Sequence, residues 1–256
     1  MSVKAKKHLG QHFLTDLNIA QKITESLTWE GYEEVLEIGP GMGVLTDFLI
    51  HDGKKVTAVE IDTESVDFLN EKYNGIKQNL PIYSENFLNM SFLDKFDRPI
   101  AIIGNFPYNI SSQILFKVLD EKEMVPEVVG MFQREVAERI ASASGNKTYG
   151  ILSVLVQAYY DVEYLFTVNE KVFNPPPRVK SGVIRLIRKR TTLDGVEDKK
   201  FKQVVKAGFS QRRKTLRNAL KSLGIPEVHK EDAVFNLRAE QLTVKDFIAL
   251  TKIMAG

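Results

Sequence analysis

The sequence contains no cysteine, only four histidines and a single tryptophan. Without cysteine the chain has no disulfide and no thiolate ligand for a metal. The histidines are scattered without ligand spacing, so we expect no metal site. No stretch approaches the roughly 18 consecutive apolar residues of a membrane-spanning helix, and the basic N-terminus lacks the apolar core of a signal peptide. These absences favour a cytoplasmic protein with no membrane association.

The composition is that of a globular protein. The 256 residues are 43% hydrophobic and 27% charged, a length that allows one large domain with a small appendage. The net charge of +2 conceals an asymmetry, because residues 178–221 contain 15 Lys or Arg and three acidic residues, whereas the remainder contains 20 basic and 30 acidic residues. The basic segment is either a solvated helix face or a surface for a polyanion.

Apolar runs alternate with amphipathic stretches as far as residue 188. The runs predicted as strands are residues 34–39, 55–61, 76–87, 99–106, 128–133, 159–168 and 181–188. The stretches predicted as helices are residues 44–53, 64–73, 111–121 and 134–143, with Asp62 or Thr63 capping the second and Ser111 or Ser112 the third of these. The alternation predicts an α/β fold with a mostly parallel sheet flanked by helices, and an antiparallel pair at its edge.

Beyond residue 190 the pattern becomes purely helical. After a polar connector, helical periodicity covers residues 201–224, 230–242 and 243–255. We therefore predict two domains, residues 1–189 with the sheet and residues 190–256 as a small all-α domain.

The first predicted strand leads into "EIGPGMGVLT". Gly39, Gly41 and Gly43 allow a tight turn and a close approach of the backbone to a ligand. A dinucleotide fingerprint, G-x-G-x-x-G, requires glycine where this chain has Val44, which disfavours a hydride-transferring dehydrogenase. With Glu37 before the glycines, the motif resembles the first motif of class I S-adenosylmethionine-dependent methyltransferases; a purely structural turn is the alternative.

Three polar or aromatic residues follow at the ends of later strands. Glu60 ends the second strand, 21 residues after Gly39, where a carboxylate can accept both hydroxyls of a ribose. Asn86 and Phe87 end the third strand, where an amide can bond the edge of an adenine and a ring can pack on its face. A turn asparagine beside a core phenylalanine explains the same pair equally well.

The fourth strand ends in "NFPY". An exocyclic amine is a poor nucleophile because its lone pair is delocalised into the ring. The Asn105 side-chain oxygen and the Pro107 carbonyl can each accept one amine hydrogen, while Tyr108 stacks on the base. The alternative is a strand that ends in a tight turn. The glycines and Glu60 upstream favour catalysis on an unpaired or flipped base.

Six segments occur in order: "KKHLGQHFLTD", "EIGPGMGVLT", "NFPYNISSQILF", "FQREVAERIASASGNKTYGILSVLVQAYY", "VFNPPPRVKSGVIRL" and "FSQRRKTLRNAL". Together they resemble the small-subunit (16S) ribosomal RNA adenine N6,N6-dimethyltransferase family, over nearly the whole chain. The resemblance implies a class I methyltransferase fold that uses S-adenosylmethionine and no metal. It implies dimethylation of two adjacent adenosines in a hairpin loop near the 3′ end of 16S rRNA, as a step in ribosome biogenesis. We expect a monomer.

The resemblance also assigns site residues. The residues expected to bind cofactor are His12, Leu14, Gly39, Gly41, Glu60, Asn86, Phe87 and Asn105. The residues expected at the target base are Asn105, Pro107, Tyr108 and Phe173. At three positions this chain departs from the commoner family residue: His12 replaces asparagine, Asn86 replaces aspartate and Phe106 replaces leucine. The Asn86 change is expected to weaken cofactor binding somewhat, and the Phe106 change to be neutral.

The basic segment fits an RNA substrate. The residues expected to neutralise rRNA phosphates are Arg178, Lys180, Arg212, Arg213, Lys214 and Arg217. Lys4, Lys6 and Lys7 either add to this surface or form a disordered basic tail.

Three other functions stay open. The first is an adenine dimethyltransferase acting on large-subunit rRNA, as in macrolide resistance, since substrate choice does not follow physically from these motifs. The second is DNA adenine methylation, which the "NFPY" form of the motif disfavours. The third is a non-catalytic assembly factor of the same fold, which the intact motifs disfavour.

Overall fold

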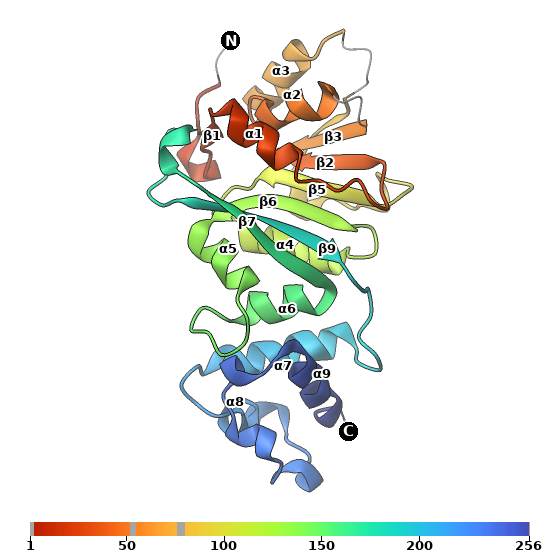
Figure 1. The fold of residues 1–256 in the computed structure, drawn as a ribbon. Helices are drawn as coiled ribbons and strands as arrows, with labels where there is room; N and C mark the ends of the chain where they lie inside the picture. The colour runs from red at the N-terminus through yellow and green to blue at the C-terminus, as the bar shows by residue number, and fades with distance from the viewer. Residues whose placement is uncertain (1–2, 52–54, 76–79, 256) are drawn as a thin grey trace. The chain divides into compact units, whose positions relative to one another are not determined.

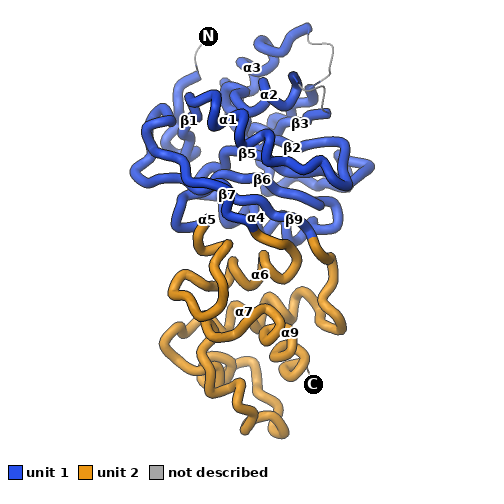
Figure 2. Tube along the Cα trace, in the orientation of Figure 1, with its two compact units in different colours: residues 1–137, 163–188 blue, residues 138–162, 189–256 orange. Residues whose placement is uncertain are grey.

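The computed structural model describes residues 3–51, 55–75 and 80–255. The chain folds into two compact units, Met1–Ala137 with Glu163–Arg188, and Glu138–Val162 with Lys189–Gly256 (Figure 2). The boundary at Arg188 lies beside the one predicted at residue 190. Residues 138–162, which we predicted within the sheet domain, belong to the second unit.

The centre of the first unit is a seven-stranded sheet in the order β4-β3-β2-β5-β6-β9-β7 (Figure 1). Its strands are β2 (Glu34–Ile38), β3 (Lys55–Glu60), β4 (Ile82–Ser84), β5 (Ile100–Asn105), β6 (Glu127–Gln133), β7 (Tyr160–Val168) and β9 (Ser181–Arg188). Strands β2 to β6 pair in parallel, and β9 pairs antiparallel with β6. The predicted α/β class with a mostly parallel sheet is confirmed. The strand order reverses between β3 and β5 around β2, where open α/β sheets bind ligands.

Two helices bury their apolar sides in the main core cluster of the sheet. They are α1 (Leu17–Thr24) and α2 (Val44–His51), which contribute Ile23 and Leu49. These side chains share the cluster with alternate residues of the strands, namely Val35, Val56, Ala101, Ile103, Val129 and Met131. Alternation with a period of two is what sends every second strand residue to one face. This packing fixes the positions of the strands and of the residues at their ends.

The remaining helices of the α/β region are α3 (Thr63–Lys72), α4 (Ser111–Asp120) and α5 (Arg134–Ala141). Asp62 caps α3 by accepting a hydrogen bond from the Glu64 amide, as predicted. The predicted serine cap of α4 is wrong, because Ile110 precedes the helix without a side-chain bond and Ser111 is already its first residue. The strand predicted over 76–87 is only β4, and residues 76–79 of that prediction lie outside the described residues.

A two-residue strand pair ties the N-terminal segment to a later loop of the first unit. Strand β1 (Phe13–Leu14) pairs antiparallel with β8 (Phe173–Asn174), so that Leu14 lies opposite Phe173. Both side chains are buried in the core cluster. The N-terminal residues are therefore held beside the sheet rather than free in solution.

The second unit contains α6 (Ile151–Tyr159), α7 (Asp198–Ser210), α8 (Leu216–Ala219) and α9 (Val244–Ile253). The helical stretch predicted over 201–224 is interrupted after Ser210, at "QRRKT", and α8 begins only at Leu216. Residues 230–242, predicted as a helix, form 3-10 turns at Ala233–Asn236 and Ala239–Gln241 instead. No helix in the described ranges is long and apolar enough to cross a membrane.

Candidate active site

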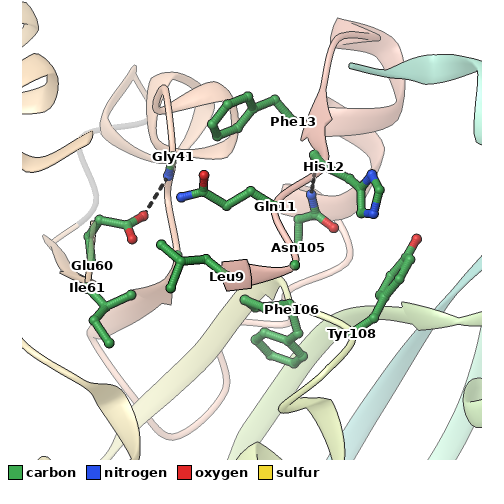
Figure 3. Close-up of a pocket in the computed structure, with 13 residues that line it drawn as sticks. Leu9, Gln11, His12, Phe13, Gly41, Glu60, Ile61, Asn105, Phe106 and Tyr108 are labelled. Carbon is green, nitrogen blue, oxygen red and sulfur yellow. Dashed lines mark hydrogen bonds between the residues drawn. The ribbon is translucent and has the colours of Figure 1, made fainter. Parts of the chain in front are cut away.

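A pocket lies where the carboxyl ends of β2, β3 and β5 meet (Figure 3). Its walls come from the N-terminal segment, the glycine turn after β2, the end of β3 and the loop after β5. The lining residues are Leu9, Gly10, Gln11, His12, Phe13, Gly39, Gly41, Glu60, Ile61, Asn105, Phe106, Pro107 and Tyr108. Seven residues predicted for the site, from four separate segments, thus line one pocket: His12, Gly39, Gly41, Glu60, Asn105, Pro107 and Tyr108.

The glycine turn has a backbone that other residues would strain. Gly39 and Gly41 have φ values of +65° and +58°, in the left-handed region. A Cβ at Gly41 would lie 2.8 Å from the Phe13 ring, so a side chain has no room there. The Gly41 amide donates a hydrogen bond to Oε2 of Glu60 at 3.2 Å. The turn therefore presents bare backbone to the pocket, beside a carboxylate.

Glu60 is buried at the end of β3, with 4% of its surface exposed. Its Oε1 accepts a bond from the Asp62 amide at 2.9 Å, in addition to the Gly41 bond on Oε2. Burial raises the pKa of this carboxyl, and the backbone donors oppose that shift. A carboxylate offers about four lone-pair positions, so these two bonds leave acceptor capacity for hydroxyl donors of a ligand.

Asn105 ends β5, and its side chain has a defined orientation. Its Nδ2 donates to the His12 carbonyl at 2.8 Å (Figure 3). Because a carbonyl can only accept, this bond identifies which end of the amide is the nitrogen and leaves Oδ1 as an acceptor. The next residue, Phe106, is buried against Phe132 with ring centroids 5.1 Å apart, and anchors the loop that carries Asn105 and Pro107.

Tyr108 is held by its hydroxyl and by a neighbouring ring. The phenol oxygen lies 2.6 Å from Oγ of Ser181, and the ring centroid lies 5.5 Å from that of His12 at an interplanar angle of 31°. Burial raises the pKa of the phenol, against the opposing effect of the Ser181 bond, so the side chain stays neutral at physiological pH. The Pro107 carbonyl accepts the Ile110 amide at 3.2 Å, and its second lone pair can accept a further donor.

A second, wider hollow adjoins the first. Its lining residues are Ala5, Lys7, Gly10, Gln11, His12, Tyr108, Gln133, Pro175, Pro176, Pro177, Arg178 and Val179. Both hollows share Gly10, Gln11, His12 and Tyr108 as walls. His12 also donates from Nδ1 to the Pro175 carbonyl at 2.7 Å. Its ring therefore joins the N-terminal segment to the loop of residues 175–177, here called the proline loop. The two hollows therefore meet at Tyr108 and His12, beside Asn105.

Asp62 holds the N-terminal segment in place across the first pocket. Lys6 Nζ lies 2.5 Å from Oδ1 of Asp62, and Gln11 Nε2 donates to its Oδ2 at 3.1 Å. Burial alone would raise the pKa of Asp62, but its bonds to Lys6 and Gln11 outweigh burial and lower the pKa below the ordinary value. Lys6 is thus ion-paired, and the alternative of a disordered tail does not hold for this residue.

Several predicted site residues lie outside both hollows. Leu14 and Phe173 are buried in the core, and Phe173 is only 4% exposed. Asn86 caps a 3-10 turn (Phe87–Asn89) through a bond from the Leu88 amide, and Phe87 is buried. Their expected contacts with cofactor or base stay predictions.

The predicted RNA-binding residues fall in both units. Arg178 and Lys180 are exposed in the first unit, and Arg178 lines the wider hollow. Arg212, Arg213 and Lys214 are exposed in the second unit, where Arg212 donates to the Lys147 carbonyl. The half-buried Arg217 bonds Asn236. Among the residues that the structure describes, no group of three or more His, Asp or Glu could hold a metal ion.

Other lining residues were missing from the sequence prediction. Leu9 and Gln11 lie in the quoted "KKHLGQHFL" segment, which was a signal for them, although only His12 and Leu14 were assigned. Ile61 follows Glu60 and is 51% exposed in the pocket wall, an unusual place for a large apolar residue and a suitable face for a flat ring. Gln133 also lines the wider hollow. Nothing in the sequence indicated this beyond its place at the end of a predicted strand.

Glu37, the acid before the glycines, lies in the sheet and not in the pocket lining. Burial raises its pKa to about 7, although the Thr46 hydroxyl donates to Oε2 at 2.5 Å. Between about pH 4.5, where the unfolded carboxyl titrates, and pH 7 the folded chain binds more protons, so stability should fall as pH rises. In Glu37→Gln we expect this pH-dependent loss of unfolding free energy, on the order of 3 kcal/mol in the wild type, to disappear.

Urea unfolding from pH 4.5 to pH 8 measures this effect. Glu37→Gln should be more stable than the wild type above pH 7, and the two should converge at the acid end. Glu33→Gln is the control, because that side chain is 80% exposed. A Glu37→Gln protein with the wild-type slope against pH would contradict the buried-acid account.

The architecture and the site define a class of protein. A parallel sheet with an antiparallel strand inserted near one edge, a glycine turn after its first parallel strand and an acid at the end of the next describe a class I methyltransferase. Residues 2–255 match the family model described as ribosomal RNA adenine dimethylase. The chain belongs to this family.

Relatives of nearly equal length are similar to the whole chain. "Ribosomal RNA small subunit methyltransferase A" of Cytophaga hutchinsonii is 57% identical over 256 residues, covering 99% of this chain and 98% of that protein. The protein of the same name from Bacteroides fragilis is 56% identical over 251 residues, covering 97% and 92%.

Solved structures show the same fold. A dimethyladenosine transferase from Plasmodium falciparum superposes with a TM-score of 0.79 at 25% identity, covering 93% of this chain and 96% of that one. The 23S rRNA methyltransferase ErmE has a TM-score of 0.69 at 24% identity, covering 95% and 100%. The second likeness concerns the fold alone.

Proposed function

We propose that this protein dimethylates N6 of two adjacent adenosines in a hairpin loop near the 3′ end of 16S rRNA, using S-adenosylmethionine, during biogenesis of the small ribosomal subunit. The observation that carries the proposal is the free Asn105 oxygen at the junction of two hollows, one beside Glu60 and the other open to the basic proline loop. The names of the most similar relatives support the choice of subunit. We also propose that it works in the cytoplasm, because ribosomal subunits are its substrate, and that it works as a monomer.

The first pocket fits S-adenosylmethionine. A Cβ at Gly41 would fill the cradle beside Phe13, and Glu60 keeps acceptor capacity for two ribose hydroxyls. Ile61 offers an apolar face for the adenine ring. When bound, the cofactor supplies an electrophilic methyl group on a sulfonium and leaves as a neutral thioether, which requires no metal.

The wider hollow would receive the target adenine, flipped out of its loop. Oδ1 of Asn105 and the carbonyl of Pro107 accept the two amine hydrogens, which favours a pyramidal nitrogen with an available lone pair. The Tyr108 ring stacks on the base and defines its plane. The His12 carbonyl keeps the Asn105 amide from turning, so that the acceptor is in place before substrate arrives. These residues act by positioning and electrostatics.

Exposed basic residues would bind the rRNA backbone. In Arg213→Ala/Lys214→Ala we expect weaker binding to small subunits and a slope of log Kd against log salt that is smaller by about 1 for each lost phosphate contact. Filter binding at several salt concentrations measures both quantities. The control is Lys55→Ala/Arg98→Ala, the same change of charge beside the amino-terminal ends of β3 and β5, away from the residues that line the pocket. Equal salt slopes for the wild type and both double variants would show that Arg213 and Lys214 do not contact the RNA backbone.

A methylation assay tests the proposed function directly. Small subunits that lack the dimethylated adenosines are incubated with labelled S-adenosylmethionine, and the labelled nucleotides are mapped, with free large-subunit rRNA in parallel. We expect N6,N6-dimethyladenosine at two adjacent positions near the 3′ end of 16S rRNA. Label on large-subunit rRNA alone would make the protein a resistance-type enzyme, and subunit binding without label would make it an assembly factor.

A further inference from the structure

Ser181 is the first residue of β9 and has no exposed surface. Its backbone lies directly opposite Gln133 in the antiparallel ladder, and β6 in turn pairs with β5, which ends at Asn105. The strand pairing holds its backbone at the start of a paired strand rather than on a loop. From there its Oγ reaches the phenol oxygen of Tyr108 at 2.6 Å. A buried hydroxyl requires a partner, and in this structure that partner is the aromatic residue of the "NFPY" loop.

The Tyr108 ring is thereby held at both ends. At its backbone end the Tyr108 carbonyl accepts a bond from Oγ of Ser111 at 3.1 Å, and the Pro107 carbonyl accepts the Ile110 amide. At its far end the hydroxyl is bonded to Ser181. The motion that remains is rotation about the long axis of the ring, and the His12 ring restricts it from one side.

We propose that Ser181 is a positioning residue for methyl transfer, which fixes the direction of the long axis of the Tyr108 ring and, together with the His12 ring, the plane in which the target adenine stacks. The inference rests on the proposed function, because it concerns the base that Tyr108 would stack against. Asn105 and Pro107 can take one amine hydrogen each only if the base lies in one plane at one height. A ring free to swing would let the base stack in planes where these acceptors are out of reach.

A double-mutant cycle separates this role from ordinary packing. The proteins are the wild type, Ser181→Ala, Tyr108→Phe and the double variant, with kcat and both KM values measured on undermethylated small subunits. We expect Ser181→Ala and Tyr108→Phe each to lower kcat roughly five- to tenfold, the worth of one oriented hydrogen bond. Because both remove the same bond, the double variant should be no slower than the slower single variant. In Ser181→Ala the KM for S-adenosylmethionine should stay within about twofold of the wild type, since Ser181 does not line that pocket.

Ser153→Ala is the matched control. Ser153 is also fully buried and donates to the Arg139 carbonyl, but it lies in the second unit. The Ser153→Ala variant should have a lower melting temperature than the wild type, without the selective loss in kcat expected of Ser181→Ala. A rise in both KM values together with a fall in kcat in Ser181→Ala would indicate general loosening and overturn the proposal. So would a double variant whose loss is the product of the two single losses, because Ser181 would then act apart from the Tyr108 hydroxyl.

The cycle also distinguishes this inference from the proposed function. If the wild type methylates small subunits and Ser181→Ala is as fast, the function stands and the positioning role is wrong. If the wild type transfers no methyl group to either subunit, the proposed function fails, and the inference that rests on it fails too.

Discussion

Asn105→Ala should reduce methyl transfer at least about 100-fold, the size of effect seen when one oriented polar group is removed from the charge-stabilising part of an active site. The alanine loses the Oδ1 acceptor for the adenine amine. It also loses the Nδ2 bond to the His12 carbonyl, which holds the N-terminal segment beside the site. Single-turnover transfer to undermethylated small subunits measures the loss in the chemical step, without interference from product release.

Asn109→Ala is a suitable control for Asn105→Ala. Asn109 lies in the same loop and also carries an amide, but its side chain is exposed and lines neither hollow. It should retain activity within a few fold. Subunit binding by Asn105→Ala should remain near that of the wild type, since the basic residues are untouched. If Asn105→Ala turned over at the wild-type rate, the proposed role of Asn105 as a hydrogen-bond acceptor for the adenine amine would be wrong.

The fold was predictable because its signal is local. Short apolar runs separated by amphipathic stretches predict βαβ units, and the structure confirms a mostly parallel sheet at those runs. The same argument failed where local and tertiary preferences differ. Residues 230–242 have helical periodicity, yet they form two 3-10 turns, and the amide of Leu216 bonds the carbonyl of Leu237 in this region. Such a contact between distant segments leaves no periodic trace.

The candidate site was predictable in part for a related reason. Gly39, Glu60 and Asn105 end or follow adjacent parallel strands, and parallel strands place their carboxyl ends at one edge of the sheet. Sequence spacing therefore translated directly into proximity. Asn86 and Phe173 were assigned by resemblance, and the structure places neither in the lining of the two hollows.

The contacts that hold the site together were not predictable. Lys6 reaches Asp62 across 56 residues, Tyr108 reaches Ser181 across 73, and His12 reaches Pro175 across 163. Each residue has an ordinary local explanation: a basic tail, a helix cap, a strand serine or a turn proline. Only the folded chain shows that these side chains brace the residues that would touch cofactor and base.

Glu60→Gln should lower the affinity for S-adenosylmethionine at least about 100-fold. The carboxylate would give the ribose two charge-assisted hydrogen bonds, each worth about 1.5–3 kcal/mol. An amide cannot replace it, because Oε1 and Oε2 already accept the amides of Asp62 and Gly41. A side-chain NH2 would face one of those donors, so the substitution also disturbs the glycine turn. Calorimetric titration with the cofactor measures the dissociation constant without requiring RNA.

The pH dependence of cofactor binding gives a second test of Glu60. Burial raises the pKa of the carboxyl above its ordinary value of 4.5, and protonation removes the charge that binds the hydroxyls. Wild-type affinity should therefore fall on acidification, and at a higher pH than an ordinary glutamate would impose. Glu60→Gln, already uncharged, should be weak at every pH and lack this fall. Glu64→Gln, an exposed acid four residues on, should behave as the wild type. Equal affinity of Glu60→Gln and the wild type at pH 7 would show that Glu60 does not bind the ribose. The cofactor would then have to bind elsewhere along the edge of the sheet.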